Sequence, residues 1–198
     1  KLVFKLFYQE CSILIFVLFL SGCGVITGKA ASQIPRENAG LPEVYFCPKA
    51  DCSKVLEAHI NSANIYAHCA LYSIDLRNVI NALAKKSKAI DVKVVMDSSN
   101  YRGQIKGDAV RMDDDRQLMH NKFCIIDDKI VLTGSQNPTD RDSNYNNNNL
   151  VVIHSAFLAK NYNDEFDELW SGKFGEGGKV EYPVIFLNDL KVENYFCP

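Results

Sequence analysis

Two short apolar runs separated by a three-residue polar turn place the tightest limit on how this chain can fold. Residues 123–126 and 130–132 are apolar, and Asp-Asp-Lys stands between them at residues 127–129. Runs of this length around such a connection are typical of two paired strands. The polar residues at the outer ends of the two strands are therefore expected to meet.

These polar residues are suited to phosphate chemistry. His120 and Lys122 lead into the first run, and Ser135 and Asn137 follow the second. Alternate residues of a strand share one face, so we expect each pair to point the same way. An imidazole supplies a nucleophile or proton carrier, an ammonium binds an anion, and a hydroxyl and a carboxamide complete the hydrogen bonding. The sequence predicts an anion site whose chemistry needs no metal.

The joint spacing of these residues resembles the His-Lys-Asp motif of the phospholipase D superfamily, in particular its small Nuc-like endonuclease branch. The residues that carry the resemblance are His120, Lys122, Asp127, Gly134, Ser135 and Asn137. The resemblance implies that Lys122, Ser135 and Asn137 bind the non-bridging oxygens of a phosphate. Asp127 is expected to be structural, because it lies on the turn, where it would tie the hairpin through backbone hydrogen bonds.

The resemblance also implies a mechanism that uses two copies of the motif and no cofactor. His120 of one copy would attack phosphorus to form a phosphohistidine. The histidine of the other copy would protonate the leaving oxygen and then activate the water that frees the product. The second copy would come from a homodimer or from a longer chain.

One residue departs from the family pattern. A glutamate that orients the catalytic histidine is expected in an Asn-x-Glu-Asn stretch, and this chain has Asn148 at that position. A carboxamide can orient an imidazole but supplies no negative charge to stabilise its cation. The departure predicts reduced activity, and a gain from Asn148→Glu unless another group already orients the ring.

The N-terminal part of the chain has the pattern of an export signal. Residues 1–22 combine Lys1 and Lys5 with an apolar core at residues 13–20, and Leu-Ser-Gly precedes Cys23. The box resembles that of bacterial lipoproteins, which implies cleavage before Cys23 and lipid on its thiol. An uncleaved anchor helix is the competing interpretation. Both predict an exported, membrane-tethered protein, with residues 23–42 as a linker.

The rest of the chain alternates strands and helices. The expected strands are residues 44–47, 65–74, 92–96 and 150–153, and the expected helices are residues 53–61, 76–86 and 156–170. This alternation predicts a layered α/β domain over residues 43–171, with a mixed sheet flanked by helices and one copy of the motif. The resemblance implies the same phospholipase D-like fold.

The seven cysteines of the chain include four in the predicted domain that bear on its stability. Cys47 and Cys52 flank a turn-like spacer and are expected to form a disulfide in an oxidising compartment. A zinc site is less favoured, because no second pair of ligands has suitable spacing. Cys69 and Cys124 lie within apolar strands and are expected to be small core residues.

The end of the sequence repeats the start of the predicted domain. Residues 193–198 share five identities with residues 43–48. Residues 172–198 are therefore expected to contain a linker and the possible start of a second, truncated copy. The start of a second copy of the domain would fit the phospholipase D superfamily, whose members act with two copies of the motif.

These observations favour a metal-independent phosphodiesterase, most simply an endonuclease that acts on DNA or RNA. The net charge of −2 gives no global attraction for a polyanion, so local basic residues would have to bind it. A phospholipase D or phosphatidyltransferase is the first alternative, because the predicted tether places the protein at a membrane. A binding module whose activity is weakened by Asn148 is the second.

Overall fold

The structure is a computed structural model that describes residues 33–113, 117–175 and 177–197. Residues 34–198 group into one compact unit. The predicted signal sequence and Cys23 lie outside the described residues, so both stay predictions. Among the residues described, no helix is long and apolar enough to cross a membrane.

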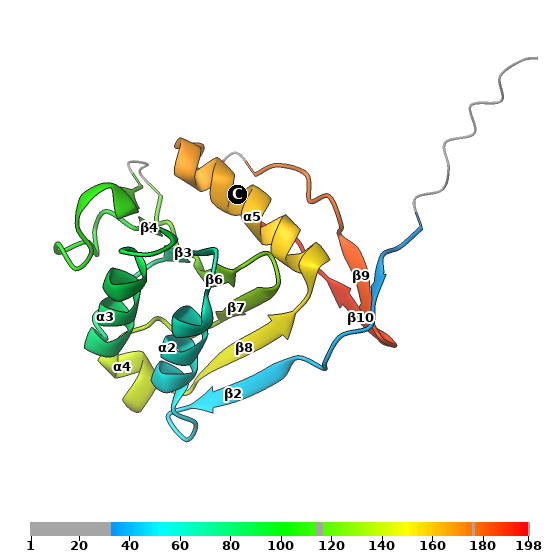
Figure 1. The fold of residues 1–198 in the computed structure, drawn as a ribbon, viewed down its shortest axis with the longest axis horizontal. Helices are drawn as coiled ribbons and strands as arrows, with labels where there is room; N and C mark the ends of the chain where they lie inside the picture. Colours follow the sequence, from blue (N-terminus) through cyan, green and yellow to red (C-terminus); the bar gives the residue numbers. More distant parts are fainter. Residues whose placement is uncertain (1–32, 114–116, 176, 198) are drawn as a thin grey trace, which may run out of the picture. The chain divides into compact units, whose positions relative to one another are not determined.

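Within these ranges the chain forms two sheets, four α-helices and a short 3-10 helix (Figure 1). In chain order the elements are β1 (Arg36–Glu37), β2 (Glu43–Cys47), α2 (Cys52–Ser62), β3 (Tyr66–Leu71), α3 (Arg77–Lys86), β4 (Asp91–Met96), η1 (Gly107–Ala109), β5 (Val110–Met112), β6 (Lys122–Ile126), β7 (Ile130–Gly134), α4 (Asp140–Asn144), β8 (Asn148–His154), α5 (Ala156–Ser171), β9 (Val184–Leu187) and β10 (Leu190–Glu193).

The larger sheet has seven strands in the order β2-β8-β7-β6-β3-β4-β5. Strands β3, β4 and β5 are parallel, whereas β6, β7, β8 and β2 pair antiparallel. The predicted hairpin is confirmed: β6 and β7 pair with Phe123 opposite Thr133 and Ile126 opposite Ile130. The mixed α/β fold is confirmed with it.

The sheet is covered on both faces, which explains its apolar strands (Figure 1). Helices α2 and α3 pack on one face through side chains such as Leu56, Ile60 and Leu83. Helix α5 packs on the other face, where Phe166 is fully buried. Strand β6 contributes to both cores, because Cys124 faces α2 and α3 while its neighbour Phe123 faces α5.

The stretches expected as linkers contain a second, three-stranded sheet, which corrects that expectation. β9 pairs parallel with β1 and antiparallel with β10. Glu37 of β1 accepts hydrogen bonds from Ser155 Oγ and from the Ala156 N–H at 2.8 Å, so it stabilises the start of α5. Such long-range pairing leaves little trace in local sequence. Strand β5 is likewise absent from the strands expected above.

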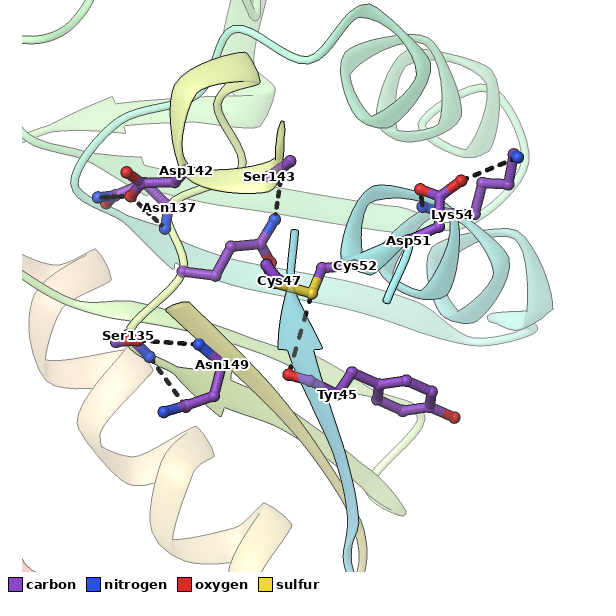
Figure 2. Close-up of a disulfide and its surroundings, with 11 residues drawn as sticks. Tyr45, Cys47, Asp51, Cys52, Lys54, Ser135, Asn137, Asp142, Ser143 and Asn149 are labelled. Carbon is purple, nitrogen blue, oxygen red and sulfur yellow. Dashed lines mark hydrogen bonds and ion pairs between the residues drawn. A yellow bond between two sulfur atoms is a disulfide. The ribbon is translucent and has the colours of Figure 1, made fainter. Parts of the chain in front are cut away.

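The cysteines give one confirmed prediction and one correction. Cys47 and Cys52 form the expected disulfide, seen in Figure 2 between β2 and the start of α2. Cys69 and Cys124 are buried as predicted, but they also form a disulfide. They stand opposite each other on the antiparallel strands β3 and β6, and this pairing was not visible in the sequence.

Candidate active site

The sheet topology brings the predicted site residues to one edge. Strands β3, β4 and β7 run in the same direction, so their carboxyl ends lie at the edge where β6 and β8 begin. At this edge Lys122 begins β6, Ser135 follows β7 and Asn148 begins β8. The chain folds this way because β6 is central and apolar on both faces, which leaves its polar residues at the strand end.

His120 and Lys122 meet around Tyr72. The His120 and Tyr72 rings lie edge to face with centroids 4.6 Å apart, and Lys122 Nζ is 5.2 Å from the Tyr72 ring centroid. Lys122 Nζ also donates to the His120 carbonyl oxygen at 2.8 Å. Tyr72 is held in place by its N–H, which donates to the Asn121 carbonyl at 2.8 Å and continues the β3–β6 pairing.

The environment of His120 favours its neutral form. Partial burial and the nearby Lys122 ammonium lower the pKa of His120, and the Asp97 carboxylate acts in the opposite direction. Burial also lowers the pKa of Lys122, with Asp142 opposing it. A neutral imidazole beside an ammonium has a free lone pair for attack on phosphorus, and its neighbour attracts the phosphate oxygens.

Ser135 is exposed and fixed by β8. Its Oγ accepts from the Asn149 N–H at 3.0 Å, and its own N–H donates to the Asn149 side-chain oxygen at 3.3 Å (Figure 2). The preceding Gly134 has φ 144°, and a Cβ there would lie 2.4 Å from the Asn149 carbonyl oxygen. Glycine thus permits the close approach of β7 and β8 that positions the serine.

Asn137 is turned toward a carboxylate that sequence reasoning missed. Its backbone N–H and its Nδ2 both donate to Asp142 Oδ2, at 3.1 and 2.7 Å (Figure 2). The Asn137 side-chain oxygen is buried without a partner among the described residues. Asn137 therefore links Asp142 to the site rather than presenting its amide freely.

Asn148 also lies beside Asp142. Burial raises the pKa of Asp142, but hydrogen bonds from Asn146, Asn137 and Asn148 outweigh it and hold the pKa below its usual value. The position at which the family pattern has glutamate is therefore next to an ionised carboxylate. A second carboxylate at residue 148 would be repelled by Asp142.

Asp97 follows β4 at the same edge, and its negative charge raises the pKa of His120. Asp97 is 2% exposed, and its carboxylate accepts a hydrogen bond at 3.2 Å from the N–H of Met119, the residue directly before His120. It also accepts from the Ser99 N–H at 3.1 Å and from Asn100 Nδ2 at 2.9 Å. These bonds fix the position of the carboxylate, so Asp97 can position the histidine backbone and stabilise an imidazolium.

We expect Asp97→Asn to lower turnover about tenfold and to move the acid limb of the pH–rate profile to lower pH. The direction follows because Asp97 raises the pKa of His120, so its removal lowers that pKa. Asn148→Glu is expected to give no gain. Rates measured from pH 5 to 9 test both variants, and a higher rate in Asn148→Glu would show that the missing glutamate limits the reaction.

Asp127 is a structural residue at the opposite edge of the sheet. Its carboxylate accepts the N–H groups of Asn64, Ile65 and Tyr66 at 2.7, 2.8 and 2.9 Å. It ties the β6–β7 turn to the start of β3, rather than closing the turn on itself. Partial burial raises the pKa of Asp127, but the three N–H donors outweigh it and lower the pKa.

Asp127→Ala is therefore expected to lower the free energy of unfolding by about 2 kcal/mol at pH 7, because three N–H groups lose an acceptor. The lowered pKa means that this contribution is present above the unfolded-state pKa and is lost as the pH falls through the lower folded-state pKa. Urea unfolding at pH 7 and pH 3 measures it. Asp127→Asn, which tolerates the positive φ of 51°, is the matched control. Lost turnover with unchanged stability would instead indicate a catalytic role.

Two of the residues missed by sequence reasoning, Tyr72 and Asp97, share one signal. Tyr72 and Asp97 each directly follow a buried strand, β3 and β4, at the edge that carries His120. A polar residue after a buried strand is a useful candidate only once the strand order is known. Asp142 had no signal of this kind, since α4 was not predicted. Across residues 33–113, 117–175 and 177–197, no group of three or more His, Cys, Asp and Glu residues is arranged to hold a metal ion.

The large mixed sheet flanked by helices has the layered fold of a phospholipase D-like domain. Residues 56–170 match the family model described as "Cardiolipin synthase, PLD-like domain". The chain belongs to this family, within the phospholipase D superfamily, whose members are phosphodiesterases and other hydrolases.

Comparisons with individual proteins give relatives of two kinds. The chain is 34% identical over 92 residues to the mitochondrial cardiolipin hydrolase of Xenopus tropicalis, covering 42% of this chain and 44% of that protein. It is 31% identical over 145 residues to the phospholipase D of Rickettsia bellii, covering 66% and 68%. The match thus spans less than half of the Xenopus protein.

Among solved structures, the chain resembles Nuc from Salmonella typhimurium, a phospholipase D family member. The TM-score is 0.58 with 25% sequence identity, over 67% of this chain and 95% of Nuc. The likeness covers almost the whole of Nuc.

Proposed function

We propose that the protein is a metal-independent phosphodiesterase that hydrolyses DNA or RNA. The observation that carries the proposal is the setting of His120, a neutral imidazole at an open sheet edge beside the Lys122 ammonium and the fixed Asp97 carboxylate. The likeness to Nuc over 95% of that chain favours the nuclease over other phosphodiesterases.

In the proposed reaction, a His120 nitrogen attacks phosphorus and the bond from phosphorus to the leaving oxygen breaks. The leaving oxygen takes a proton from the histidine of a second copy, and water then attacks the phosphohistidine to free the product and His120. Lys122 and Ser135 bind the non-bridging oxygens as negative charge develops. Two copies are needed because one histidine cannot be nucleophile and acid in the same step.

The second copy is proposed to come from a homodimer, or from a longer chain that carries a second copy of the motif. Activity that rises more steeply than linearly with protein concentration supports the homodimer. An excess of the His120→Ala chain should then lower the activity of the wild-type chain, because the two chains form mixed dimers. Activity that is linear in concentration and insensitive to the added variant would contradict a dimer.

Phospholipid is the alternative substrate, because relatives are named cardiolipin hydrolase and phospholipase D. Cleavage of plasmid and of RNA in EDTA, set against release of headgroup from cardiolipin-containing vesicles, separates the two. Nucleic acid cleaved with vesicles intact supports the proposal, and the reverse overturns it. Nucleic acid that binds with a steep salt dependence and stays uncut would identify a weakened binding homologue.

The protein is also proposed to be exported and tethered through lipid on Cys23. The two disulfides of the domain support an oxidising compartment. Membrane fractionation tests the tether: Cys23→Ala should move the protein to the soluble fraction if lipid holds it. Unchanged membrane association would favour the uncleaved anchor helix.

A further inference from the structure

A cavity of about 420 Å³ opens beside His120. This volume lies in the range of small-molecule binding sites. Its walls are formed by the residues before β6, the second half of α5, the segment that follows α5 and the end of the described chain. The mechanism proposed above uses only His120 from this set, so the cavity has no assigned role.

Aromatic and apolar side chains line much of this cavity. Phe174, Tyr195 and Phe196 contribute rings, and Leu118 adds an aliphatic wall. Leu118 and Tyr195 are 60% and 64% exposed, so both offer open surface to a ligand. Phe196 is anchored, because its ring lies edge to face with Tyr162 at 5.0 Å. The cavity therefore presents an aromatic wall, of which Phe196 is anchored, and open apolar surface beside His120.

The polar group of interest in the cavity is Glu165 of α5. Burial and the nearby Glu168 raise the pKa of Glu165 to about 7. Glu168 is engaged, since its Oε2 accepts the Gly178 N–H at 3.0 Å. In the part of the chain that the structure describes, the Glu165 carboxyl has no hydrogen-bond partner. A half-buried carboxyl without a partner is available to accept N–H groups from a ligand.

We propose that this cavity binds the nucleobase next to the phosphate that His120 attacks, which rests on the proposed nuclease function. The flat face of the base stacks on the aromatic wall, and its Watson–Crick edge donates to Glu165. Guanine gains most, because it presents two adjacent N–H donors to one carboxyl group. Lys173 is exposed at the cavity, where its ammonium can bind a neighbouring phosphate of the nucleic acid. An acyl chain fits less well, since it would bury the Glu165 carboxyl without a partner.

The test uses the full chain and five oligonucleotides in EDTA. They are identical except at one position, which carries guanine, adenine, cytosine, thymine or no base. We expect cleavage at the adjacent phosphate to be roughly tenfold faster, as kcat/KM, with guanine than without a base. Glu165→Gln should reduce the guanine preference, and Tyr195→Ala should reduce the preference for every base over the abasic site. Asp167→Asn, which removes an exposed acid from the same helix outside the cavity, should change neither.

Equal cleavage of all five substrates, or preferences unchanged in both cavity variants, would overturn the cavity assignment while leaving the nuclease intact. No cleavage of any oligonucleotide, with headgroup release from vesicles, would overturn the nuclease. Calorimetric titration with guanosine monophosphate and ribose 5-phosphate then tests, independently of cleavage, whether the cavity binds a base. Tighter binding of the guanosine monophosphate, weakened in Glu165→Gln, supports it, and equal binding of the two ligands overturns it.

Discussion

His120→Ala is expected to lower turnover at least about a thousandfold, because it removes the proposed nucleophile and no other group can form the covalent intermediate. The wild-type rate should fall on the acid side as His120 becomes protonated. Burial and Lys122 lower the pKa of His120, so this limb lies below the usual pKa of histidine. When a reaction with substrate labelled at phosphorus is quenched before completion, labelled phosphohistidine should be trapped on the wild type and not on the variant.

His154→Ala is the matched control for this experiment. His154 is a half-exposed histidine at the end of β8, and its Nε2 lies 4.0 Å from Glu43 Oε1 of β2. Its removal tests the loss of a histidine without touching the site. If His120→Ala keeps a tenth or more of the wild-type rate, or if the label is still trapped, His120 is not the nucleophile. If both variants lose activity equally, the loss reflects folding, and urea unfolding of each would show it.

Removal of the disulfide between Cys69 and Cys124 is expected to lower the free energy of unfolding by about 4 kcal/mol. The bond closes a loop of 55 residues in sequence, and a long loop constrains the unfolded chain most. Both sulfurs are buried between β3 and β6, so alanine is the appropriate replacement at each position. Urea unfolding of Cys69→Ala/Cys124→Ala against the oxidised wild type gives the difference.

The other disulfide provides the comparison. Cys47 and Cys52 are 5 residues apart, so Cys47→Ala/Cys52→Ala is expected to cost only about 2 kcal/mol. Both pairs are buried, which makes the loss of packing similar, and the difference isolates loop length. Equal losses in the two double variants would contradict the loop argument and place the cost in packing instead.

Much of the fold could be predicted because its signals are local. The hairpin of β6 and β7 was visible as two apolar runs around a polar turn, and helices α2, α3 and α5 as periodic apolar residues. Strand β5 has only three residues, and β1 has two. Strands this short have no periodicity of their own and exist because a neighbouring strand pairs with them. Strand β1 was missed for this reason, whereas β9 and β10, with four residues each, were missed because they lie in a stretch expected to be a linker.

Some residues of the candidate site could be predicted from the sequence, and others are placed there only by the fold. His120, Lys122 and Ser135 flank one hairpin, so their proximity follows from sequence neighbours. Tyr72 and Asp97 come from strands that precede the hairpin by tens of residues, and only the strand order places them beside it. Glu165 looks like any acid of an amphipathic helix until folding places it in the wall of the cavity beside His120.

By itself the sequence determined the hairpin, the alternation of strands and helices, the position of the His-Lys-Ser set at one end of that hairpin and the pairing of Cys47 with Cys52. The tertiary structure alone decided that Asp97 is coupled to His120, that Asn148 lies against Asp142, that Cys69 pairs with Cys124 and that a cavity adjoins the histidine. The physical reason is the range of the interactions. Turns, periodic burial and short loops act between near neighbours in the chain, whereas strand order and the electrostatics of a sheet edge depend on segments that meet only after folding.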